Sequence, residues 1–194
     1  MTRISPINPA TATGTARELL NGVESKLGMI PNMMSTMANS PAVLDAYLKF
    51  SGALAAGGLS AKDRERIALA VGQANRCDYC LSAHTAIGKM VGLSAEQIRD
   101  ARSATDADAK SDAIVKFAAQ LVEKRGWVSD DEVAAARRAG LGDSEIAEVV
   151  ANTALNLLTN YFNHVAETDN DFPPAEPIDS PASCGCHSDT CGVA

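Results

Sequence analysis

Helix-starting and helix-ending signals recur along this chain, and they constrain its fold more than any other feature. Serine, threonine or proline repeatedly precedes a stretch with apolar residues at helical spacing, and glycine repeatedly follows it. Residues of the first kind favour helix N-termini, and glycine ends helices because it adopts the left-handed conformation without strain. The starting signals are Thr15, Ser40-Pro41, Ser60, Ser94 and Ser129, and the ending signals are Gly28, Gly57, Gly92, Gly126 and Gly140.

These signals predict a series of helices and leave almost no strand pattern. The 34 alanines favour helix and close helix–helix approach, whereas only eight residues are aromatic. We therefore expect an all-α, compact multi-helix domain. The expected helices cover about residues 15–28, 33–37, 41–56, 61–74, 77–91, 94–102, 112–125, 129–139 and 143–167.

The composition changes at Thr168, after the last expected helix. An acidic stretch with three prolines follows, and small residues and cysteines make up the end of the chain. Proline removes a backbone donor and prevents the helix from continuing. We expect a helical domain over residues 1–172, and a flexible Pro-rich linker and Cys-rich tail over residues 173–194.

The charge and hydropathy of the chain exclude several classes of protein. The formal net charge is -7, with 17 basic and 24 acidic residues, which argues against a binder of nucleic acid phosphates. There is no apolar run long enough to span a membrane, and the N-terminus shows no signal-peptide pattern. We expect the protein to be cytoplasmic. In the cytoplasm, cysteines are more often catalytic or metal-binding than structural.

The sequence Cys77-Asp78-Tyr79-Cys80 is the pattern most informative about chemistry, because His84 follows it by four residues. Cys-x-x-Cys brings two sulfurs within disulfide reach, and the first turn of a helix favours the thiolate. His84 shares a helix face with Cys80 and can take up its proton. The spacing therefore makes Cys80 the better-placed nucleophile and Cys77 the resolving thiol.

Three other interpretations of the two cysteines compete with redox chemistry. A Cys-x-x-Cys can be half of a zinc site, which needs about four ligands, and only the tail offers more thiols. A thioredoxin-like motif would need a βαβ context, which the helical pattern does not provide. Two buried, inert cysteines are the simplest alternative.

With Glu65, the motif resembles the alkylhydroperoxidase D-like branch of the carboxymuconolactone decarboxylase superfamily. The family pattern has a glutamate twelve residues before Cys-x-x-Cys and a histidine four residues after it. Glu65, Cys77, Cys80 and His84 match all four places. A looser likeness extends over about residues 15–172 and leaves out the tail.

The resemblance implies a thiol-dependent peroxidase that assembles as a homotrimer or homohexamer and needs no cofactor. By this analogy Cys80 attacks the hydroperoxide, Cys77 closes a disulfide, and Glu65 and His84 form a proton relay. A lipoylated or thioredoxin-like dithiol protein would restore the thiols. Alternatives on this fold are a protein disulfide reductase, a redox-sensing or metal-binding protein, and a decarboxylase with a site independent of the two cysteines.

One departure from the family concerns the position between the cysteines. The best-known members of this branch carry a second histidine there, and this chain has Tyr79. Tyrosine can donate a hydrogen bond, but with a pKa of about 10 it is a poor base at neutral pH. The departure affects the expected rate or the choice between a peroxide and a disulfide substrate.

The tail carries a second group of metal-ligand types, Cys184, Cys186, His187 and Cys191. They could bind a soft metal, although their spacing is uncommon for zinc. They could instead form a dithiol that reduces the Cys77–Cys80 disulfide, or have no role.

A few further residues carry weaker expectations. We expect Met29, Met33, Met34 and Met37 to serve mainly in packing, and His164 to lie in the core or in a subunit interface. Trp127 should pack a loop onto the core.

Overall fold

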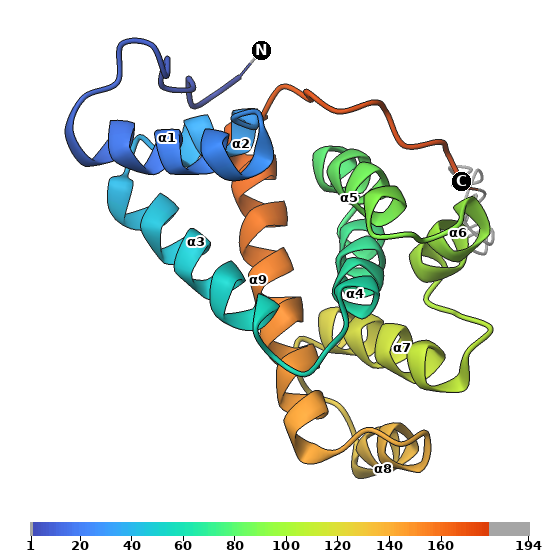
Figure 1. Ribbon diagram of the computed structural model, residues 1–194. Coiled ribbons are helices and arrows are strands. Elements are labelled where there is room, and N and C mark those ends of the chain that lie inside the picture. The colour runs from blue at the N-terminus through green and yellow to red at the C-terminus, as the bar shows by residue number, and fades with distance from the viewer. Residues whose placement is uncertain (1, 179–194) are drawn as a thin grey trace, which may run out of the picture.

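The computed structural model describes residues 2–178, and every regular element in that range is a helix (Figure 1). The all-α prediction is therefore confirmed. Figure 1 labels the elements, which are α1 (Gly14–Leu27), α2 (Asn32–Met37), α3 (Pro41–Ala55), α4 (Ala61–Ala74), α5 (Asp78–Met90), α6 (Ala95–Arg102), α7 (Ala109–Glu123), α8 (Asp130–Arg138) and α9 (Asp143–Ala166).

Most of the expected helix starts coincide with observed caps. Ser60, Ser94 and Ser129 each accept a hydrogen bond from the backbone N–H three residues later, which satisfies a donor that the helix leaves free. The starting signal expected at Thr15 is wrong: α1 begins at Gly14, and Thr13 occupies the N-cap without a side-chain hydrogen bond.

The start of α7 also differs from the expectation. The helix begins at Ala109, three residues before the predicted start at Asp112. The Asp108 carboxylate accepts a hydrogen bond from the backbone N–H of Ser111, so Asp108 is the N-cap. A polar connector rich in aspartate and alanine therefore contains a helix start that its apolar spacing does not reveal.

The helices form two groups around α9, which runs through the middle of the molecule (Figure 1). On one side α1, α2 and α3 share an apolar cluster with the first turns of α5. On the other side α4 packs against α5, α6, α7 and α9. The first turn of α5 thus lies where the two groups meet.

The α4–α5 turn places the cysteines at this junction. Arg76 has a left-handed backbone with φ 55°, and the Cys77 N–H donates to the Gly72 carbonyl at 2.9 Å. Gly72 lies against Leu81 of α5, and a Cβ at this position would be in ordinary van der Waals contact with a Leu81 methyl carbon, at 3.4 Å. The turn therefore fixes the first residues of α5 against α4.

Residues 169–176, called here the C-terminal strap, pass over α5 and reach α6 (Figure 1). Asp171 accepts from the Asn32 N–H at 2.8 Å at the start of α2, and Asn170 donates to Ser82 at 2.8 Å. The Arg102 side chain donates to the Glu176 carbonyl at 2.6 Å. The strap is thus tied to the helical domain beyond the predicted boundary at residue 172.

The strap ends before the tail cysteines. Cys184, Cys186, His187 and Cys191 lie outside the described residues. Their proposed metal or dithiol roles stay predictions.

The exposure of two side chains bears on the weaker expectations. Trp127 is 87% exposed and does not pack a loop onto the core. His164 is exposed on α9, so it is not a core residue of this chain, and its place in a subunit interface stays a prediction. Within residues 2–178, no helix is long and apolar enough to cross a membrane.

Candidate active site

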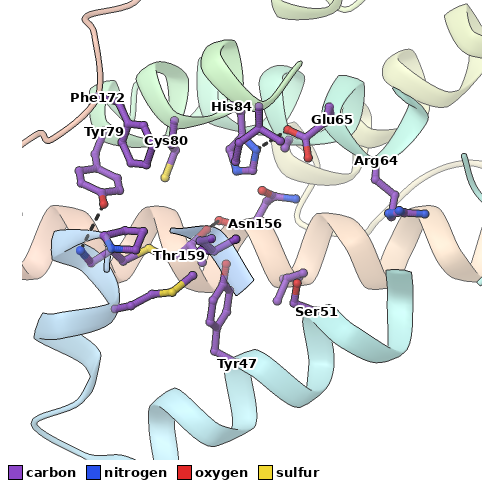
Figure 2. Close-up of a pocket in the computed structure, with 18 of the residues that line it drawn as sticks. Tyr47, Ser51, Arg64, Glu65, Tyr79, Cys80, His84, Asn156, Thr159 and Phe172 are labelled. Carbon is purple, nitrogen blue, oxygen red and sulfur yellow. Dashed lines mark hydrogen bonds and ion pairs between the residues drawn. The ribbon is translucent and has the colours of Figure 1, made fainter. Parts of the chain in front are cut away.

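A single cavity of about 400 Å³ brings together three of the four expected site residues. Glu65 comes from α4, whereas Cys80 and His84 come from successive turns of α5. Figure 2 shows their side chains at one side of the cavity, facing α3 and α9. Cys77 is 1% exposed and is not among the lining residues. Of the two sulfurs, only that of Cys80 is therefore available to a molecule in the cavity.

Glu65 and His84 form a hydrogen-bonded pair, with 2.7 Å between Glu65 Oε2 and His84 Nδ1 (Figure 2). Burial by itself lowers the pKa of His84, but the charge of Glu65 and its hydrogen bond raise that pKa above its ordinary value. The charge of Cys80 acts in the same direction. The pair therefore favours an imidazolium beside the sulfur of Cys80.

The two cysteines have opposite protonation preferences. A hydrogen bond from the Cys77 thiol is the largest cause that lowers the pKa of Cys80, to about 6, with burial opposing it. The positive charge of His84 lowers the pKa of Cys80 further. The same hydrogen bond and burial raise the pKa of Cys77. These opposite shifts favour a thiolate at Cys80 and a protonated thiol at Cys77.

The position of the cysteines in α5 supports this assignment. Cys77 is the N-cap residue, and Cys80 is the third residue of the helix. The first turn of a helix carries backbone N–H groups without helical partners and the positive end of the dipole. Both effects stabilise an anion at Cys80, as the sequence predicted for thiols in a first turn.

A buried polar face of α9 completes the surroundings of Cys80, and the sequence analysis did not assign it a role. The amide of Asn163 donates to Cys80 Sγ and to Met33 Sδ, each at 3.3 Å. Asn160 is fully buried, and its amide nitrogen has no partner among residues 2–178. The hydrogen bond from the Asn163 amide lowers the pKa of Cys80.

This face has a signal in the sequence that could have identified it. Asparagine and threonine recur at helical spacing on the side of α9 that the apolar pattern would direct to the core. A helix that buries amides in this way needs partners for them, so the pattern predicts a polar site. Its buried members are Asn152, Thr153, Asn156, Thr159, Asn160 and Asn163.

Tyr79 connects three segments around the cysteines. Its hydroxyl accepts a hydrogen bond from the Met33 N–H at 3.2 Å (Figure 2). Its ring meets that of Phe172 on the C-terminal strap edge-on, with 5.8 Å between centroids. Burial raises the pKa of Tyr79, so its hydroxyl stays neutral. Tyr79 therefore joins α2, α5 and the strap, and does not act as a base.

The cavity walls are largely apolar. Met29, Met33 and Met34 line the cavity, whereas Met37 is buried in the core, so the packing expectation holds fully only for Met37. Exposed apolar side chains at Leu27 and Met90 stand at the cavity margin. Methionine adapts its shape to irregular apolar partners, which suits a cavity for an organic molecule.

Metal ligation finds no support in the described part of the chain. Within residues 2–178, no group of three or more His, Cys, Asp or Glu side chains is arranged to hold an ion. Cys77 and Cys80 are both free thiols, and their nearest polar partners are each other, Asn163 and His84. The arrangement is suited to thiolate chemistry.

Comparisons with known proteins agree with this picture. Residues 41–124 match the Carboxymuconolactone decarboxylase family, a stretch that contains Glu65, Cys77, Cys80 and His84. The chain is similar to a peroxidase-related protein from Ralstonia eutropha JMP134, described as an alkylhydroperoxidase AhpD core. The TM-score is 0.77 and the identity 27%, over 88% of this chain and 92% of that one.

Two further structures share the fold at lower identity. One is a peroxidase-related protein from Silicibacter sp. TM1040, with a TM-score of 0.74 and 22% identity over 89% of this chain and 92% of that one. The other is the debrominase Bmp8 in complex with 2,3,4-tribromopyrrole, with a TM-score of 0.75 and 18% identity over 87% and 91%. No curated protein matches the chain.

Proposed function

We propose that this chain is a thiol-dependent peroxidase, since residues 41–124 match the carboxymuconolactone decarboxylase family and the fold is similar to that of an alkylhydroperoxidase AhpD core. Cys80 reduces the hydroperoxide, Cys77 forms a disulfide with it, and Glu65 and His84 hold and move the proton. The observation that carries the proposal is the Cys80 thiolate on the wall of an apolar cavity, backed by the Cys77 thiol.

The first step oxidises the sulfur of Cys80. Its proton passes to the His84–Glu65 pair, and the thiolate attacks the terminal oxygen of ROOH. The S–O bond forms as the O–O bond breaks, which leaves Cys80 as a sulfenic acid. The oxygen that leaves takes up one proton and departs as ROH.

The second step uses the thiol that the cavity does not expose. Cys77 attacks the Cys80 sulfenic acid, its proton joins the hydroxyl that leaves as water, and a disulfide forms. The opposite effects of the two neighbouring thiols on each other's pKa support this pairing, because they require Cys77 to lie beside the sulfur of Cys80. An external dithiol then returns both cysteines to the reduced state by exchange.

We assign the external dithiol to a lipoylated or thioredoxin-like protein and the assembly to a homotrimer or homohexamer. Exposed apolar side chains along α9, Val150, Leu158 and Val165, favour contacts between copies of the chain. Lipoyl groups are slender enough to enter a cavity, whereas the two buried sulfurs are inaccessible to a bulky surface disulfide.

The test is single-turnover oxidation by cumene hydroperoxide and by hydrogen peroxide, followed in a stopped-flow or quenched-flow instrument. Intact mass and digestion should show a Cys77–Cys80 disulfide in the wild type and a Cys80 sulfenic acid in Cys77→Ser. The Cys80→Ser variant should lose the reaction. A wild-type rate in Cys80→Ser would overturn the proposal.

A protein disulfide reductase is the main alternative on the same residues. The Cys-x-x-Cys at a helix start favours it, but the 2% exposure of Cys80 favours a small substrate in the cavity. Turnover with a small-molecule disulfide and with an oxidised protein, compared with cumene hydroperoxide, separates the two activities.

Debromination is a second alternative, because the fold is shared with Bmp8 and the cavity here is apolar enough for a halogenated ring. Release of bromide from 2,3,4-tribromopyrrole in the presence of a dithiol would favour it. Peroxide reduction without bromide release would favour the peroxidase.

A further inference from the structure

Tyr47 occupies the cavity wall that faces the reactive residues. It comes from α3, whereas Cys80 and His84 come from α5 on the other side of the cavity. Figure 2 shows the Tyr47 hydroxyl directed into the cavity, toward the Asn156 and Thr159 part of α9 and the α5 side beyond it. The sequence analysis assigned no role to this residue.

The Tyr47 hydroxyl has no hydrogen-bond partner among the described residues. The hydroxyl of Tyr79, the other tyrosine of the cavity, accepts a hydrogen bond from the Met33 N–H. Partly buried tyrosine hydroxyls usually find a partner. A hydroxyl left free in a cavity wall is therefore placed to bond a molecule inside the cavity.

The neighbouring polar groups on α9 are already used within the helix. The Thr159 hydroxyl donates to the Asn156 carbonyl at 3.0 Å, and the Asn156 amide donates to the Asn152 carbonyl at 2.9 Å. Ser51, one turn after Tyr47 on α3, is the other hydroxyl on the facing wall. Tyr47 is longer and reaches further into the cavity than Ser51 (Figure 2).

The geometry of the peroxide reaction directs the leaving oxygen toward the α3 wall of the cavity. A thiolate displaces the leaving oxygen in line, so the leaving oxygen points away from the attacking sulfur. With Cys80 on the α5 side, the leaving oxygen of a hydroperoxide is directed toward α3. The strongly basic alkoxide that forms there needs a hydrogen-bond donor as its charge develops.

We propose that Tyr47 is a catalytic residue whose hydroxyl donates to the leaving oxygen of the hydroperoxide and protonates it as the O–O bond breaks. This assignment rests on the proposed peroxidase function and adds the acid that the Cys80 step requires. It also explains why a tyrosine hydroxyl is kept free in a largely apolar wall.

The step balances without a further reagent. Cys80 is oxidised from thiolate to sulfenic acid, which keeps the hydrogen of the terminal peroxide oxygen. The leaving RO⁻ takes the Tyr47 proton and departs as ROH, and the Tyr47 phenolate then regains a proton from the His84 imidazolium or from water. Burial, followed by the negative charges of Cys80 and Glu65, raises the pKa of Tyr47 to about 12, so the hydroxyl carries its proton at neutral pH.

The test compares two oxidants of similar shape whose leaving groups differ in basicity. Cumene hydroperoxide releases a basic alkoxide, whereas perbenzoic acid releases a weakly basic carboxylate that needs no acid. The variant is Tyr47→Phe, which keeps the ring and removes the hydroxyl. The matched control is Tyr161→Phe, because Tyr161 is exposed on α9 and does not line the cavity.

In Tyr47→Phe, the rate constant for Cys80 oxidation by cumene hydroperoxide should fall about 100-fold, as for loss of one catalytic hydrogen-bond donor. With perbenzoic acid, where little charge needs stabilising, the same rate constant should fall by less than about threefold. The alkylation rate of Cys80 by iodoacetamide should stay unchanged, since Tyr47 acts on the oxidant. Tyr161→Phe should match the wild type with both oxidants.

An equal loss with both oxidants would assign Tyr47 to packing and overturn the proposal, as would no loss with either. The selective loss appearing in Ser51→Ala, and not in Tyr47→Phe, would also overturn it. If wild-type Cys80 reacts with neither oxidant, the peroxidase function itself fails, a result separate from any pattern between the variants.

Discussion

The first turn of α5 and the buried polar face of α9 contribute to the same sulfur in different ways. The α5 turn provides the groups proposed to react, Cys77 and Cys80, with His84 one turn further on. The α9 face provides no reacting group, yet Asn163 donates to Cys80 Sγ at 3.3 Å. In the proposed mechanism a short local motif therefore holds the atom that reacts, whereas a helix far away in the sequence helps to set its protonation state.

The largest effect should come from the α5 turn itself. Cys80→Ser should reduce peroxide consumption to the uncatalysed background, because a serine hydroxyl does not become an anion at this site at neutral pH. Cys77→Ser should still form a sulfenic acid in the first turnover and then stop. Mass spectrometry after a single turnover distinguishes the two variants. If both variants behaved in the same way, the separate roles assigned to Cys77 and Cys80 would be wrong.

Replacing Glu65 on α4 tests whether its negative charge keeps His84 protonated beside Cys80. In Glu65→Gln the pKa of His84 should fall, since the charge and hydrogen bond that raise it are lost. Less imidazolium then stands beside Cys80, and the rate constant of Cys80 oxidation at neutral pH should fall about 100-fold, within the range for proton-transfer groups.

The matched control for Glu65→Gln is Glu123→Gln, because Glu123 is exposed at the end of α7. Titration of His84 by NMR should show the lowered pKa in the Glu65 variant only. An unchanged His84 titration together with a reduced rate would indicate a structural role for Glu65.

The α9 face is tested by Asn163→Leu, which keeps the approximate volume and removes the amide donor. The pKa of Cys80 is held at about 6 in part by this amide, so it should rise in the variant. A hydrogen bond to a charged group contributes about 1.5–3 kcal/mol, which corresponds to a rise of about one to two pKa units. At neutral pH the oxidation rate should fall by up to about tenfold.

The pH profile separates this electrostatic role from a packing role. In the wild type, the alkylation rate of Cys80 should rise with pH through a midpoint of about 6, because the thiolate is the reactive form. In Asn163→Leu the midpoint should move upward, and the rate at high pH should recover. Asn152→Leu, on the same face of α9 but toward its other end, should leave the midpoint unchanged. A loss that high pH does not restore would contradict the role assigned to Asn163.

The same comparison explains how much of the site the sequence could predict. His84 follows Cys80 by four residues, so helix geometry alone places the two side chains on one face. Glu65 was identified through the family resemblance, because its position beside His84 depends on how α4 packs against α5. Asn163 and Tyr47 lie on helices far away from Cys80 in the sequence. Local residue spacing therefore does not predict that they lie near Cys80 in the fold.

The fold shows a similar division between local and long-range information. Ser60, Ser94 and Ser129 cap helices within their own segments, and their helix starts were predicted correctly. Trp127 was expected to pack a loop onto the core, yet the turn after α7 leaves it exposed. Its exposure depends on tertiary placement, which amino-acid type does not determine.

The smallest effect on chemistry should come from Tyr79, which lies within the α5 motif but acts on its surroundings. Tyr79→Phe keeps the edge-on contact with Phe172. It removes the hydroxyl that accepts a hydrogen bond from the Met33 N–H, so this buried N–H loses its partner. The free energy of unfolding should fall by about 1–3 kcal/mol, the cost of an unsatisfied buried donor. The rate constant of Cys80 oxidation should change by less than about threefold, because the neutral Tyr79 hydroxyl neither accepts the Cys80 proton nor contacts the leaving oxygen. Urea unfolding and stopped-flow oxidation of the same preparation measure both quantities. A large loss of rate with unchanged stability would contradict this role. It would show that Tyr79 takes part in the reaction, as Cys77 and Cys80 are proposed to do.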